Sequence, residues 1–141
     1  MKRFNRILVL TVLVSLLSLP LVAAERERTF VIRRPTVIAF FPPVTEQELS
    51  DTGNNEALAH FQFSANEARK PLHDVGITFI ENYAESFRVR LAKAVNTFRP
   101  EKIKVGYYLI APGKEPRIEY GVMTEQDLLK IAGEYFGVAV K

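Results

Sequence analysis

The stretch "TVIAFFPPVTEQEL", residues 36–49, decides the fold because it joins a long apolar run directly to a helix start. Its first part, "TVIAFF", is apolar, β-branched and aromatic, which is typical of a strand covered on both faces. Pro42 and Pro43 end that strand, since neither can donate a hydrogen bond to a ladder. The "TEQE" that follows predicts a capping box, in which Thr45 and Glu48 bond each other's backbone amides. We therefore expect a core strand that leads into a helix.

A targeting segment precedes this strand. Lys2, Arg3 and Arg6 stand ahead of an apolar run, which ends at Pro20 and a small-residue stretch closing with Ala24. That layout is typical of a secretory signal peptide. We predict a signal peptide over residues 1–24, a single domain over residues 25–141, and an exported protein that is periplasmic or secreted. The alternative is an uncleaved segment that would leave the domain tethered to the membrane.

The charge of the processed chain argues against a nucleic-acid partner. The whole chain has 19 basic and 16 acidic residues, and three of the basic ones lie in the signal. Removing residues 1–24 leaves 16 of each, so the basic pI of the precursor belongs to the targeting segment.

The chain contains no cysteine. Thiol redox chemistry, thiolate catalysis, cysteine-ligated metal and a lipid anchor on a cysteine at the signal are therefore excluded. Exported proteins of this size often depend on disulfides. Here the core must be held by packing alone.

A long helix follows the first strand and its cap. "SDTGNN" at 50–55 is typical of a loop, so we expect a fresh helix start at Asn54 or Asn55. Pro71 is expected to kink or divide the helix near Lys70, and Gly76 to end it. One helical face carries the apolar residues Leu58, Phe61, Ala65, Ala68 and Leu72.

The remaining pattern predicts strands and a final helix. "FRVRL" alternates strictly, which indicates a half-exposed strand, and it can form a hairpin with "NTFRP". "PGKEP" predicts a turn, and "TEQD" repeats the capping pattern before the last helix. The other expected strands are "TFVIRR" at an edge, "ITFIENY", "IKVGYYLIA" and "RIEYGV".

This element order resembles the thioredoxin superfamily. The likeness rests on "TVIAFFPPVTEQEL" as a strand entering a helix, and on "VGYYLIAPGKEPRIEYGVMTEQDLLKIAGEYF" as a closing strand, turn, strand and amphipathic helix. The resemblance implies an α/β fold: a thioredoxin-like three-layer sandwich with a mixed central sheet and helices on both faces. Two strands joined by a helix should pair in parallel, and the closing hairpin should be antiparallel.

The chain departs from that family at the residues that do its chemistry. Thr45 and Glu48 stand where thioredoxins carry the two cysteines of Cys-x-x-Cys, and Lys104, Val105 and Gly106 stand where they carry a cis-proline. The resemblance thus implies a thioredoxin-like domain without redox activity. We expect a binding or accessory module whose partner is an unknown protein or an anionic component of the envelope.

One region is locally basic and is the candidate binding surface. Two readings stand: it holds an anionic lipid headgroup, glycan or protein surface, or it is a solvated face balanced by the acidic residues within 46–56. Phe87 and Phe98 are interleaved with the basic residues. The candidate residues are Arg88, Arg90, Lys93, Arg99, Lys102 and Lys104.

The alternative function is an enzyme with a polar site at the carboxyl ends of the core strands, around Thr45, His60 and Tyr107. No serine lies in a GxSxG motif, and no Gly-rich phosphate loop is present. His60 and His73 are the only histidines, which is too few for a recognisable metal site. The sequence therefore predicts no catalytic residue, no metal and no cofactor.

The processing of the N-terminus can be tested directly. Sequencing the N-terminus of the exported protein should give Glu25 as the first residue, because the small residues before it fit the signal peptidase. A chain that still begins at Met1 would contradict cleavage and support the tethered form.

Overall fold

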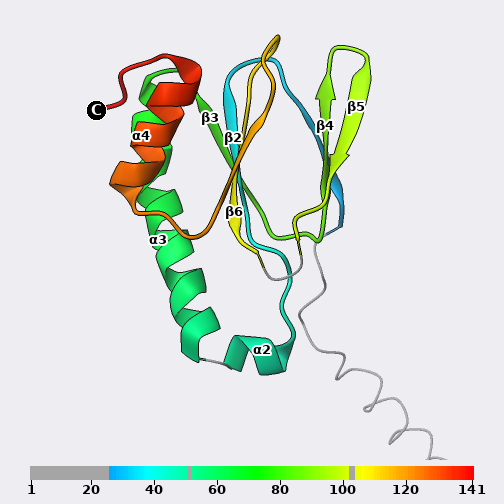
Figure 1. Ribbon diagram of the computed structural model, residues 1–141, viewed down its shortest axis with the longest axis vertical. Helices are drawn as coiled ribbons and strands as arrows, with labels where there is room; N and C mark the ends of the chain where they lie inside the picture. Colours follow the sequence, from blue (N-terminus) through cyan, green and yellow to red (C-terminus); the bar gives the residue numbers. More distant parts are fainter. Residues whose placement is uncertain (1–25, 51, 102–103) are drawn as a thin grey trace, which may run out of the picture.

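The computed structural model describes residues 26–50, 52–101 and 104–141 as a mixed α/β arrangement (Figure 1). The predicted signal, residues 1–24, lies outside these ranges. The strands are β1 (Arg28–Val31), β2 (Thr36–Phe40), β3 (Thr78–Asn82), β4 (Phe87–Leu91), β5 (Ala94–Phe98), β6 (Gly106–Ile110) and β7 (Arg117–Tyr120). The helices are α2 (Glu46–Ser50), α3 (Thr52–Asp74) and α4 (Glu125–Phe136).

The strands form two sheets. The larger has the order β3-β2-β6-β7, with β2 parallel to β3, β6 antiparallel to β2, and β7 antiparallel to β6. The smaller has the order β1-β4-β5, with β1 parallel to β4 and β5 antiparallel to β4. The expected parallel pair joined by a helix, the closing antiparallel hairpin and the β4–β5 hairpin are all confirmed.

Strand β2 is buried along its whole length, as the apolar run predicted. Val37 and Ala39 belong to a core cluster shared with residues of α3 and α4. Ile38 and Phe40, which point the other way, belong to a second cluster shared with Phe87 and other residues of the smaller sheet. Since side chains alternate along a strand, only two separate covering layers could bury all of them.

The prediction of helices on both faces of the central sheet is wrong. The two longer helices cover one face, and the smaller sheet covers the other, so the layers are helices, large sheet and small sheet (Figure 1). The segment between β3 and β6 forms the hairpin β4–β5, as its sequence predicted, and this hairpin takes the place of a helix on the second face. Its strict alternation buries Phe87 and Val89 and exposes Arg88 and Arg90, a pattern that suits a strand.

Aromatic rings fill the space between the two sheets. Phe98 of β5 lies 4.9 Å from Tyr108 of β6 and 5.2 Å from Phe40 of β2, measured between ring centroids. Phe87 of β4 meets Tyr108 edge-on at 5.5 Å. Each such pair contributes about 0.5–1.5 kcal/mol beyond the burial of its area. These contacts attach the β4–β5 hairpin to the central sheet.

The capping box is present at the start of α2. The backbone N–H of Thr45 donates to the Glu48 carboxylate at 2.7 Å, and the N–H of Glu48 donates to Thr45 Oγ1 at 3.1 Å. The side-chain amide of Asn54 then donates to the backbone carbonyl of Glu48 at 2.7 Å. Helix α2 ends at Ser50 and α3 is a separate helix, so the predicted break is confirmed.

Two details of α3 differ from expectation. The helix begins at Thr52 and not at Asn54 or Asn55, and it continues through Pro71 to Asp74 instead of dividing near Lys70. Pro71 lies in the last turn, where its missing N–H removes a single intrahelical bond. The end is as predicted: Gly76 has a φ of +81°, and its N–H donates to the His73 carbonyl at 2.9 Å.

The closing hairpin and final helix follow the sequence pattern. The Thr124 hydroxyl accepts a bond from the Asp127 amide at 3.2 Å, which caps α4 as predicted. In the β6–β7 turn the Lys114 ammonium donates to the Tyr135 carbonyl, and the Tyr135 hydroxyl donates to the Glu115 carbonyl at 2.6 Å. The "PGKEP" segment is therefore a turn that holds the end of α4.

Gly106 of β6 gives a sharp test of the sheet packing. A Cβ there would lie 2.3 Å from the Glu119 carbonyl oxygen and 2.8 Å from Phe40 Cζ. We predict that Gly106→Ala lowers the free energy of unfolding by about 2–3 kcal/mol through overpacking. The control, Gly53→Ala, has open space around the new methyl and should stabilise α3 by about 0.5–1 kcal/mol. Urea denaturation measures both, and equal stabilities would contradict the close approach.

Candidate functional site: the basic face of the smaller sheet

The smaller sheet turns one face toward solvent. Arg88 and Arg90 project from its central strand β4 and are exposed. Arg88 has Thr29 of β1 and Thr97 of β5 as its cross-strand neighbours. Arg90 has Val31 of β1 and Val95 of β5 as its cross-strand neighbours. The exposed face thus presents two rows, each with an arginine at its centre.

Strand β1 brings a second basic segment to this sheet. Its parallel pairing with β4 continues beyond the strand, because the N–H of Ile32 donates to the Arg90 carbonyl at 2.9 Å. Residues 26–34 and 85–99, which form this sheet and its flanks, hold eight basic residues against Glu27 and Glu85. Their net charge is +6, and the rest of residues 25–141 carries −6. The added basic residues are Arg26, Arg28, Arg33 and Arg34.

Sequence reasoning missed this contribution of β1. The clustering of arginine in residues 26–34 is visible in the sequence, but its partner strand lies 59 positions further along, since Arg28 pairs with Phe87. Short-range patterns carry no information on a parallel pairing across that separation. The sequence feature that could have revealed this contribution was the run of arginines around an expected edge strand, because an edge strand must pair with another strand.

Nearby carboxylates neutralise part of the predicted surface. Arg88 pairs with Glu27 at 2.8 Å and Arg99 with Glu85 at 3.6 Å, counted between nitrogen and oxygen. Glu27 also accepts a bond from the Ser86 hydroxyl at 2.5 Å. The counter-ions of these arginines therefore flank the smaller sheet itself.

Five of the six predicted residues lie in the part of the chain that the structure describes. Lys104 lies outside the hairpin, over the Tyr120 ring of β7, and its bond to the Glu101 carboxylate raises its pKa. Lys102 lies outside the described residues. Among the residues that the structure describes, Arg90 and Lys93 form no ion pair. The usable part of the predicted surface is thus the hairpin, with Arg88, Arg90 and Lys93.

The closed end of the hairpin is exposed and partly apolar. Residues 92–97 are all exposed, and Val95 and Val31 keep 44% and 53% of their surface in contact with solvent. Ala92 in the turn has a φ of +51°, which is unusual for a residue other than glycine. Arg33 and Arg34 follow β1 at this same end, because β1 and β4 run in parallel (Figure 1).

The three residues of the alternative enzyme site have different surroundings. Thr45 caps α2, His60 is exposed on α3, and Tyr107 is fully buried in β6. The Tyr107 hydroxyl accepts a long bond of 3.4 Å from the Met123 amide. Burial raises the pKa of Tyr107, and the bond from Met123 lowers it by less. A proton-transfer role at neutral pH would need a shift in the opposite direction.

Two adjoining hollows lie between α3 and the start of α4. Their volumes are about 370 and 270 Å³, and both are open to solvent. They share His60, Ser64 and Thr124 in their linings. His60 is exposed and Ser64 is buried, and both belong to α3.

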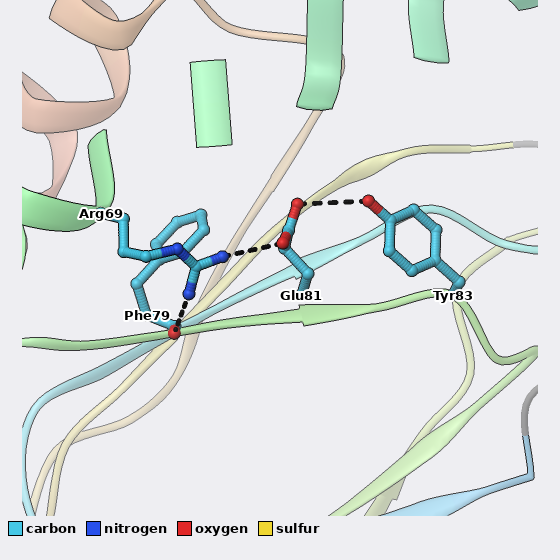
Figure 2. A network of polar contacts seen from close by, with 4 residues as sticks. All are labelled: Arg69, Phe79, Glu81 and Tyr83. Carbon is cyan, nitrogen blue, oxygen red and sulfur yellow. Dashed lines mark hydrogen bonds and ion pairs between the residues drawn. The ribbon is translucent and has the colours of Figure 1, made fainter. Parts of the chain in front are cut away.

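A polar network holds α3 against the edge of the larger sheet (Figure 2). Arg69 donates to the Glu81 carboxylate at 2.8 Å and to the Phe79 carbonyl at 3.3 Å, while Tyr83 donates to Glu81 at 3.2 Å. The Arg69 guanidinium also lies over the Phe79 ring, 5.3 Å from its centroid. Since β3 is an edge strand, these contacts cover part of the open edge of the larger sheet. The network therefore has a role in stabilising the fold.

The described residues contain neither a metal-binding cluster nor a membrane-spanning helix. No three side chains of His, Asp or Glu gather there in a way that could hold a metal ion. No described helix is long and apolar enough to cross a bilayer.

Comparison with known proteins adds no assignment. The chain matches no family model, no curated protein and no solved structure. The geometry of the described residues therefore carries the functional argument.

The raised pKa of Tyr107 predicts a pH effect on stability. A tyrosine ionises near pH 10 in the unfolded chain. Because the folded pKa is higher, Tyr107 contributes stability that is present below pH 10 and lost as the pH rises further. Tyr107→Phe should cost about 0.5–1.5 kcal/mol at pH 7 through the lost bond, and less at pH 11. Urea unfolding at both pH values measures this, and an unchanged difference would contradict it.

Proposed function

We propose that this protein is an exported thioredoxin-like domain without redox activity, which acts as a binding module for an anionic component of the cell envelope. The observation that carries the binding role is the parallel pairing of β1 with β4. It gathers two basic segments on one side of the molecule with a net charge of +6.

The topology of the larger sheet supports the thioredoxin-like part of the proposal. A strand, a helix and a parallel strand come first, and an antiparallel hairpin and a helix come last. This is the order that the resemblance implies. In this chain the smaller sheet covers the second face of the larger sheet, where the resemblance implies a helix. This cover is the feature that distinguishes the chain from the fold that it resembles.

The strand-to-helix junction supports the absence of redox chemistry. The chain has no cysteine, and the capping box of Thr45 and Glu48 satisfies the backbone amides at the start of α2. A hydroxyl cap and a carboxylate at this position are both stabilising, and such a cap contributes about 1 kcal/mol. The junction therefore acts as a joint of the fold.

The exposed face supports an anionic partner. Arg90 and Lys93 lack ion pairs among the described residues, and Arg88 shares its partner Glu27 with Ser86. Residues 28–34 and 86–99 contain no acidic side chain. A cationic surface of this kind attracts anionic partners over about a Debye length.

Replacing three basic residues of the hairpin tests the proposal. The variant with Arg88→Ser, Arg90→Ser and Lys93→Ser should elute from dextran sulfate at much lower salt than the parent protein. Each lost charge removes about 1 kcal/mol of attraction to an anionic surface at low ionic strength. The measurement is the salt concentration at elution.

A control variant removes two remote charges, with Lys130→Ser on α4 and Lys141→Ser at the C-terminus. It should elute close to the parent protein, because these lysines lie outside the basic sheet. Unchanged elution of the triple variant, or equal losses in both variants, would reject the smaller sheet as the binding surface.

A further inference from the structure

We propose that the closed end of the β4–β5 hairpin, together with the loop after β1, is a membrane-docking tip that takes an anionic phospholipid bilayer. This inference rests on the proposed anionic binding role and names its ligand. The docking tip is defined by Val31, Arg33, Arg34, Arg90, Ala92, Lys93, Ala94 and Val95.

The docking tip exposes small apolar side chains on both sides of a lysine in the hairpin turn. Ala92 and Ala94 lie on either side of Lys93 in the hairpin turn, and all three are exposed. Val95 and Val31 stand behind them on the outer face and are among the exposed large apolar residues of the described chain. Figure 1 shows the hairpin on the side of the molecule opposite α3 and α4, with its turn free of other elements.

Further basic side chains stand among and beside these apolar residues. Arg90 lies between Val31 and Val95 in the cross-strand register. Arg33 and Arg34 are exposed in the loop that leaves β1 beside the hairpin. No acidic residue interrupts these segments. Apolar and basic side chains are therefore interleaved at this end of the smaller sheet, with Lys93 in the turn itself and Arg90 in the same row as the two valines.

A bilayer fits this arrangement better than a soluble polyanion does. At a bilayer surface the long Arg and Lys side chains reach the anionic headgroups, while the exposed Val and Ala side chains beside them gain by leaving water at the acyl boundary. A polysaccharide or an acidic peptide would use the charges but gain little from the valines. The apolar residues thus separate the two kinds of partner experimentally.

Vesicle sedimentation of the processed chain, residues 25–141, tests the docking tip. One set of vesicles is phosphatidylcholine alone, and the other contains one part phosphatidylglycerol to three parts phosphatidylcholine. The parent protein should bind the second set and not the first. Arg90→Ser with Lys93→Ser should weaken binding about 25-fold, since each basic residue near the surface contributes about fivefold.

The apolar variant is the decisive one. Val31→Ser with Val95→Ser should weaken vesicle binding by about tenfold or more and leave elution from dextran sulfate unchanged. The matched control, Val122→Ser with Val138→Ser, changes two exposed valines of the helical side and should bind as the parent does. Circular dichroism and urea unfolding confirm that each variant is folded.

A tryptophan probe reports insertion directly. The chain has no tryptophan, so Val95→Trp places a single emitter at the docking tip and Val138→Trp places one far from it. Emission of the first should shift to the blue with phosphatidylglycerol vesicles, and emission of the second should not. The probe does not depend on the stability of a serine variant.

The outcomes separate this inference from the proposed function. Retention on dextran sulfate without vesicle binding, or vesicle binding that ignores both valines and leaves the tryptophan unshifted, overturns the docking tip and leaves the anionic binding role standing. If the basic variants keep both their retention on dextran sulfate and their vesicle binding, both proposals are overturned.

Discussion

The whole arrangement depends on the burial of β2 from both sides. Five consecutive residues, Thr36–Phe40, are buried, and their side chains alternate between two core clusters. Water must be excluded from both faces of this strand at once, because each large apolar side chain gains about 1.5–3 kcal/mol from full burial. Helices α3 and α4 exclude it on one side. The smaller sheet is what the other side requires.

This requirement also explains where the charged residues lie. A strand that covers a core with one face must present its other face to solvent. In β4 the covering residues are Phe87 and Val89, and the outward residues between them are Arg88 and Arg90. The aromatic contacts of Phe98 with Phe40 and Tyr108 fix the hairpin in place. The basic face is therefore held on a rigid support and not on a free loop.

Local patterns predicted the local structure well. The caps at Thr45 and Thr124, the glycine that ends α3 and the two hairpins all depend on residues a few positions apart, and each is present. The cover of the second face was predicted wrongly because it depends on the distant pairing of β1 with β4. The same pairing added residues 26–34 to the basic surface.

The candidate site residues divide in the same way, into those that local patterns placed correctly and those whose surroundings depend on distant strand pairing. Arg88 and Arg90 could be placed on an exposed strand face by alternation alone. The partners that neutralise some basic residues could not, since Glu27 reaches Arg88 only through the strand pairing. Tyr107 was assigned to a possible polar site, but the two-sided cover of the large sheet buries it beside Phe61, with ring centroids 5.9 Å apart.

The separation of charge between the layers gives the molecule an electrical polarity. The smaller sheet with its flanks carries +6 and the remainder of residues 25–141 carries −6, so the net charge of these residues is zero while its distribution is uneven. In the field of a negatively charged surface such a molecule experiences a torque before it makes contact. It would arrive already turned with the smaller sheet forward, and dissolved salt would weaken this alignment.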